Sequence, residues 1–114
     1  MKFDPGFAVE VTRDDSAIQV ALSGELDLAT LPELKAAMPA PEPGEMLIVD
    51  LRELEFVDSS GVSMLLRLDV AARAEGWTLV VVRGIPAVQR MLDLCHLGER
   101  VRLVDEPAEA GPTG

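Results

Sequence analysis

The sequence predicts an α/β domain built on a small, mixed and mostly parallel sheet. Two short apolar runs, MLIVDL at 46–51 and TLVVVRG at 78–84, have the length and continuity of strands that are buried on both faces. Apolar residues at helical spacing follow each run, and two loosely alternating segments precede them. Strands that are joined by helices lie parallel through right-handed crossovers, so the order predicts about five strands in one sheet.

Length and charge limit the classes of function. The chain has 114 residues and a mass of 12.3 kDa, which suits one domain with one core. Its net charge of −10 repels phosphate backbones and anionic lipid, so we expect no direct nucleic acid partner and no membrane insertion. The acidic excess serves either solubility or steering toward a basic partner surface.

The N-terminal third predicts a hairpin and a short helix. Phe7–Arg13 and Ala17–Ser23 alternate between apolar and polar residues, and Asp14, Asp15 and Ser16 lie between them. A helix over about 30–38 is indicated by Thr30 ahead of a proline and by apolar residues at helical spacing. These apolar residues are Leu28, Leu31, Leu34 and Met38. The proline-rich segment 39–45 predicts a loop that ends the helix.

Two further helices follow the predicted central strands. The first covers 62–76 and ends at Gly76, and its expected apolar stripe is Val62, Leu65, Leu66, Val70 and Ala74. The second covers 86–98, between Pro86 and Gly98, with its stripe at Val88, Met91, Leu92 and Cys95. A last strand is predicted at 101–105. The domain therefore spans 1–105, and we expect the segment 106–114, which has no periodicity, to be disordered.

An acid and two hydroxyls separate the run 46–57 from the helix that follows. One interpretation of DSSG at 58–61 is a helix cap, because a side-chain oxygen there satisfies free backbone N–H groups and contributes about 1 kcal/mol. A second interpretation is an activated serine nucleophile. That site needs glycines on both sides of the serine and a base, whereas Asp58 occupies one side and the only histidine, His96, lies in a distant helix end.

The third interpretation is a regulatory phosphorylation site. Free amides and the positive end of a helix dipole tolerate a phosphate at a helix start, so the fold survives the modification. The added charge of about −1.5 to −2 would act on whatever protein binds that surface.

The chain resembles the bacterial anti-sigma factor antagonists, members of the STAS domain family, which also includes cytoplasmic domains of sulfate transporters. Four segments carry the resemblance, which spans residues 7 to 105, and DSSG after an apolar strand is the most specific part. They are GELD at 24–27, IVDLRELEFVDSSG at 48–61, VVVRG at 80–84 and PAVQRMLDLCHLG at 86–98. The resemblance implies a STAS-like fold with helices mainly on one face of the sheet.

The function that this resemblance implies is partner switching. The unphosphorylated protein would bind an anti-sigma factor that is also a serine kinase, a GHKL-type ATPase, and so release a sigma factor. The kinase would then inactivate the protein by phosphorylating it, and a PP2C-type phosphatase would reverse the step.

The resemblance also places the site. The serine after the aspartate is the phosphorylated one, which is Ser59, with Ser60 as the less favoured neighbour. The expected partner-binding residues are Asp27, Asp58, Ser59, Ser60, Gly61, Val62, Ser63 and Met64. The family commonly has a glycine or alanine where this chain has Ser63, whose hydroxyl would lie one helical turn beyond Ser59 and could alter kinase docking.

Other functions fit the sequence less well. A STAS docking subunit of a lipid-transport ABC system or a stress-signalling complex, without phosphorylation, is the alternative. We expect no enzyme activity, cofactor or metal, because the sequence has no metal-ligand set, glycine-rich phosphate loop or catalytic pair. No secretory leader or run of eighteen apolar residues is present, and the one cysteine, Cys95, allows no disulfide within the chain, so we expect a cytoplasmic protein.

Overall fold

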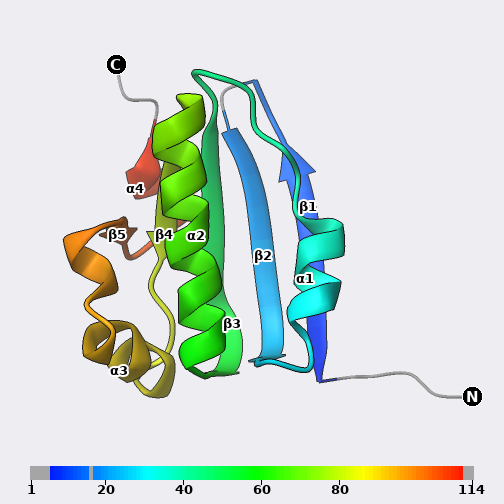
Figure 1. Cartoon of the computed structure of the whole chain (residues 1–114), viewed down its shortest axis with the longest axis vertical. Helices are drawn as coiled ribbons and strands as arrows, with labels where there is room; N and C mark the ends of the chain where they lie inside the picture. The colour runs from blue at the N-terminus through cyan, green and yellow to red at the C-terminus, as the bar shows by residue number, and fades with distance from the viewer. Residues whose placement is uncertain (1–5, 16, 112–114) are drawn as a thin grey trace, which may run out of the picture.

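The computed structural model describes residues 6–15 and 17–111 and contains one five-stranded mixed sheet with the strand order β1-β2-β3-β4-β5 (Figure 1). The strands are β1 (Phe7–Arg13), β2 (Ala17–Leu26), β3 (Met46–Val57), β4 (Thr78–Val82) and β5 (Arg102–Val104). The helices are α1 (Leu31–Ala37), α2 (Ser59–Glu75), α3 (Pro86–Leu94), the 3₁₀ turn η1 (Leu97–Glu99) and α4 (Pro107–Ala110). The predicted fold class and element order are confirmed.

Strand pairing follows from the connections. β1 and β2 form an antiparallel hairpin, whereas β2, β3, β4 and β5 pair in parallel. Asp14 closes the hairpin: its backbone N–H donates to the carbonyl of Ala17, and its Oδ1 accepts from the N–H of Ala17, both at 3.0 Å. Ser16, which we included in this turn, lies outside the described residues.

The main core lies between the sheet and α1, α2 and α3, which cover one face of it (Figure 1). Leu47, Val49 and Leu51 point from β3 into this core, as alternate positions of a strand do. The positions between them, Met46 and Ile48, belong to a smaller apolar cluster on the opposite face, together with Val80, Val82, Val104 and Ala110. β3 is therefore apolar at successive positions because both of its faces are covered.

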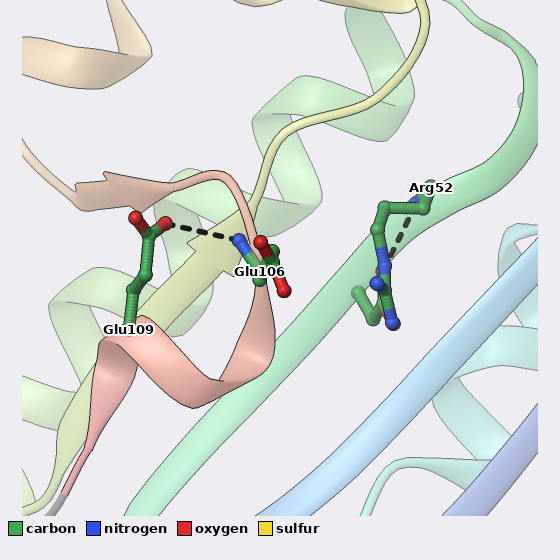
Figure 2. A network of polar contacts seen from close by, with 4 residues as sticks. Arg52, Glu106 and Glu109 are labelled. Carbon is green, nitrogen blue, oxygen red and sulfur yellow. Dashed lines mark hydrogen bonds and ion pairs between the residues drawn. The ribbon is translucent and has the colours of Figure 1, made fainter.

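The C-terminal segment differs from the disordered tail that we expected. Residues 107–110 form α4, which buries Ala110 against the smaller cluster. The side chain of Glu109 accepts a hydrogen bond from the backbone N–H of Glu106 at 3.1 Å, and this contact caps the start of the short helix (Figure 2). Arg52, also shown there, donates from Nη2 to Oδ2 of Asp50 at 2.9 Å, and both residues belong to β3. Residues 112–114 lie outside the described part.

The apolar stripe of α2 was predicted incorrectly in its second half. Val70 is 59% exposed and Ala74 is also exposed, whereas Leu68 and Ala72 are buried. Steps of four residues overshoot one helical turn and rotate by about 40° each, so the predicted stripe drifted off the buried face. The third predicted helix also ends early, because His96 adopts a left-handed conformation at φ 57° after α3.

Asp69 forms a buried polar link between α2 and the segment after η1. Its Oδ2 accepts from Arg73 at 3.0 Å and from Arg100 at 3.1 Å, and Arg73 also donates to the carbonyl of Arg100 at 3.0 Å. The side chain of Asp69 is only 7% exposed, and these two guanidinium groups compensate for the burial of its carboxylate. No helix among the described residues is long and apolar enough to cross a membrane.

Candidate functional site at the β3–α2 junction

The DSSG segment joins the end of β3 to the start of α2, beside the end of β2 (Figure 1). Val57 pairs with Leu26 as the last residue pair of the two strands, and the N–H of Asp58 donates to the carbonyl of Leu26 at 3.2 Å. Parallel strands bring their carboxyl ends to the same edge of the sheet, so the turn after β2 lies against the start of α2. The junction is thus held from two segments that are distant in sequence.

Asp58 caps α2, as the first interpretation of the motif predicted. Its Oδ1 accepts the backbone N–H of Ser60 at 3.0 Å, the hydroxyl of Ser60 at 2.6 Å and the N–H of Gly61 at 3.1 Å. The hydrogen bond from the Ser60 hydroxyl is the largest cause that lowers the pKa of Asp58; burial opposes it, and the amides of Gly61, Ser60 and Leu28 add to it. The junction therefore carries a fixed negative charge at neutral pH.

The two serines have different roles. Ser60 is half-buried, and its hydroxyl donates to Asp58. Ser59, the first residue of α2, is exposed, and no described residue forms a hydrogen bond with its hydroxyl. The hydroxyl that a modifying enzyme can reach without breaking the cap is therefore that of Ser59.

Gly61 allows α2 to approach the sheet closely. A Cβ at this position would lie 2.6 Å from Cγ2 of Val57 and 3.0 Å from Cγ of Leu26. Real Cβ atoms do not approach that closely, so a larger residue would push the first turn of α2 away from the strand ends. Gly61 shapes the site through packing and is itself buried.

Burial removes two residues from the partner-binding surface that we expected. Val62 is fully buried and Met64 is 7% exposed, and both belong to the main core. A side chain that is packed in the core has no free surface for a partner, so these two residues instead pack the first turns of α2 against the core. Ser63 lies between them in the sequence and is exposed, on the outer face of α2.

Asp27 orders the turn that faces Asp58. Its Oδ1 accepts from the N–H groups of Ala29 at 3.0 Å and Thr30 at 3.1 Å, and its own N–H donates to Oγ1 of Thr30 at 3.0 Å. The hydroxyl of Thr30 donates to the carbonyl of Glu25 at 2.9 Å. These bonds fix the turn that contains Leu28, whose backbone amide contributes to the lowered pKa of Asp58.

Two exposed apolar side chains near the junction were not predicted from the sequence to belong to the site. Leu28 is 73% exposed and Phe56 is 47% exposed, although both are large and hydrophobic. The helical spacing had assigned Leu28 to the stripe of α1, whereas it lies in the turn before that helix. The only indication in the sequence that Phe56 belongs to the site was its position, two residues before Asp58. Exposed apolar side chains of this size around a polar centre are typical of protein interfaces.

A serine nucleophile is not supported by the geometry. His96 lies after α3, its side chain is 71% exposed, and its Nδ1 is 3.2 Å from Glu99. No described residue serves as a base for Ser59, and no three His, Cys, Asp or Glu side chains come together as metal ligands in the part of the chain that the structure describes. A groove of about 670 Å³ lies beside α3, and none of the four DSSG residues lines it.

The chain belongs to the STAS domain family: the family model described as "Mlab, STAS domain" matches residues 9–105. The chain is 28% identical over 105 residues to the anti-sigma F factor antagonist of Paenibacillus polymyxa, with 90% of each chain covered. An anti-sigma factor antagonist from Mycobacterium paratuberculosis has a similar structure, with a TM-score of 0.78, 27% identity, and 94% of this chain and 93% of that chain covered. The structure of the anti-sigma factor antagonist SpoIIAA in its unphosphorylated form shares the fold, with a TM-score of 0.65, 22% identity, and 90% and 92% of the two chains covered.

Proposed function

We propose that this protein is an anti-sigma factor antagonist whose binding to an anti-sigma factor is switched off by phosphorylation of Ser59. The observation that carries the proposal is the contrast between the two serines of the junction. The hydroxyl of Ser60 is held by Asp58 at 2.6 Å, whereas Ser59 is exposed and its hydroxyl has no partner among the described residues. The names of the relatives support the general role of antagonist.

The binding surface of the unphosphorylated protein would centre on Ser59. Leu28, in the turn after β2, and Phe56, near the end of β3, are exposed apolar side chains of the two segments that meet at the junction, and Ser63 would extend the surface by one turn of α2. The partner would be an anti-sigma factor with serine kinase activity of the GHKL type, and its capture by this surface would release a sigma factor. The protein itself would act by binding, as a cytoplasmic regulator without catalysis of its own.

Phosphorylation would act on binding and leave the fold intact. A phosphate on Ser59 lies at the N-terminus of a 17-residue helix, where backbone amides and the helix dipole favour negative charge. It also adds a charge of about −1.5 to −2 next to the carboxylate of Asp58. A partner surface that fits the neutral hydroxyl must then desolvate a phosphate beside a fixed anion, which costs several kcal/mol of binding free energy. A PP2C-type phosphatase would restore the binding form.

One observation favours a second candidate function. The family model that matches the chain is described with the name Mlab and makes no mention of sigma factors. A STAS subunit of a lipid-transport ABC system or a stress-signalling complex would use the same fold for docking without phosphorylation.

The two candidates differ in the fate of Ser59. The protein is isolated from its own cells with phosphatases inhibited, and phosphopeptides across residues 53–67 are mapped by mass spectrometry. We expect phosphate on Ser59 that is lost in Ser59→Ala, retained partner binding in that variant, and loss of binding in Ser59→Asp. Ser60→Ala is the matched control and keeps its phosphate on Ser59. An absence of phosphate on both serines under every growth condition would contradict the proposal and favour the docking subunit.

A further inference from the structure

The outer face of α2 carries a second hydroxyl that the proposed switch does not use. Ser63 follows Ser59 by four residues, so the two side chains are neighbours one helical turn apart. Val62 and Met64, on either side of it in the sequence, are buried, which directs Ser63 to the solvent. No described residue forms a hydrogen bond with the hydroxyl of Ser63. Ser59 and Ser63 are thus the accessible serines of α2, since Ser60 is bound to Asp58.

Arg67 lies one further turn along the same face of α2 and, like Arg90 on α3, has no partner among the described residues. It is exposed, and its guanidinium forms no ion pair or hydrogen bond with any described residue. Most other arginines have partners: Arg13, Arg52, Arg73, Arg83 and Arg100 form ion pairs, and Arg102 donates to backbone carbonyls. Although the chain has 20 acidic and 10 basic residues, no described acidic side chain forms an ion pair with Arg67.

We infer that Ser63 is a second phosphorylation site, whose phosphate is held by Arg67. An anion four residues before a cation is the favourable orientation on a helix, because it agrees with the helix dipole. Arginine also binds phosphate oxygens through two N–H groups. The inference rests on the proposed function, because it assigns Ser63 to the kinase that modifies Ser59.

The chemical step is an ordinary phosphoryl transfer. The hydroxyl oxygen of Ser63 attacks the γ-phosphorus of a nucleoside triphosphate, the bond to the β–γ bridging oxygen breaks, and the nucleoside diphosphate leaves. The hydroxyl proton passes to solvent or to a base of the kinase. A kinase docked at Ser59 would find Ser63 about 6 Å further along the helix axis.

The two phosphates would differ in their surroundings. The phosphate on Ser59 would follow Asp58 directly in the sequence and raise the negative charge of the junction, whereas the phosphate on Ser63 would be partly neutralised by Arg67. Phosphorylation of Ser63 therefore extends the blocked surface along α2 without adding repulsion at the cap. The switch would have three states, with zero, one and two phosphates.

The first test counts and maps phosphates. The full chain is incubated with ATP and a lysate of its own cells as the source of kinase, and intact mass spectrometry is followed by peptide mapping. We expect up to two phosphates on the wild type, one fewer on Ser63→Ala, and Ser60→Ala identical to the wild type. Phosphate on Ser59 alone would overturn this inference and leave the proposed function standing. If no serine carries phosphate, both this inference and the proposed function are overturned.

The second test measures the role of Arg67 without a kinase. Phosphoserine is incorporated at position 63 during translation, and the phosphate is titrated by ³¹P NMR. Arg67→Gln should raise the second pKa of the phosphate by about 0.3 units, since a helical ion pair of this spacing contributes a few tenths of a kcal/mol. Arg90→Gln on α3 is the matched control, because Arg90 is also an exposed arginine without a described partner. Equal pKa values in the two variants would overturn the assignment of Arg67.

Discussion

Replacing Asp58 tests how the junction is held together. Asp58→Ala removes the acceptor of the hydrogen bonds from Ser60 and Gly61. Loss of the cap costs about 1 kcal/mol, loss of the charge at the helix start about 0.5 kcal/mol, and loss of the partner of the Ser60 hydroxyl about 0.5 kcal/mol. We therefore expect the free energy of unfolding to fall by about 2 kcal/mol, which lowers the Tm by roughly 8–15 °C for a domain of this size.

Urea denaturation followed by the fluorescence of Trp77 measures this change. Trp77 is the only tryptophan and is 6% exposed, so its emission should report global unfolding. The matched control is Asp58→Asn, which keeps the acceptor and loses the charge, and it should cost about 0.5 kcal/mol at neutral pH. Equal losses in the two variants, or a loss below about 0.5 kcal/mol for alanine, would refute the reasoning.

The stability difference between the wild type and Asp58→Asn should depend on pH. The pKa of Asp58 is lowered in the folded protein, so the stability that its charge contributes is present above the pKa of the unfolded state and is lost as the pH falls through the folded pKa. The difference between the wild type and Asp58→Asn should therefore shrink below about pH 4. A difference that stays constant down to acidic pH would contradict the assignment.

Three further changes have defined outcomes. Ser60→Ala should raise the pKa of the neighbouring carboxylate and lower the stability by about 1 kcal/mol, which carboxyl NMR titration and urea denaturation measure; an unchanged pKa would contradict the hydrogen bond. Gly61→Ala should destabilise by about 1 kcal/mol although alanine favours helices, because its Cβ would lie 2.6 Å from Val57; a higher Tm would show that the helix can shift. Deletion of 106–114 should lower the free energy of unfolding by about 1–2 kcal/mol, since it uncovers the cluster that Ala110 helps to bury, and an unchanged urea midpoint would argue against this packing.

The parts of the fold that follow hydrophobic periodicity were predictable from sequence. The continuous run at 46–51 located β3, but the strand continues to Val57, where the residues pair with β2 alone. The pairing with β2 shifts register twice, since Ala21↔Asp50 is followed by Ser23↔Glu53 and Gly24↔Leu54 by Glu25↔Phe56. Each shift places one extra residue in β3 and interrupts its alternation, so a period of two gives no indication of this part of the strand. α4 was missed because a four-residue helix is too short for a periodic pattern and is stabilised by its packing.

The site was predictable to a smaller extent. The motif itself predicted the helix cap at Asp58, because cap residues have local physical causes, whereas Ser59 and Gly61 were assigned to the site through the family resemblance. Which hydroxyl is free depends on a side-chain hydrogen bond, and the exposure of Phe56 depends on how the end of β3 packs. Such features are set by tertiary contacts, which a single sequence does not reveal.

The buried carboxylate of Asp69 limits how far a change at the start of α2 can spread. It fastens the second half of the helix to Arg100, in the segment after η1, so the helix and this segment should move as one body. A charge that is added two to three turns earlier then has no loose element to displace, and chemical shift changes on phosphorylation should fade within the first turns of α2. Phosphorylation would then change the surface charge and leave the conformation unchanged, so a partner would distinguish the two states only by contacting the modified surface directly.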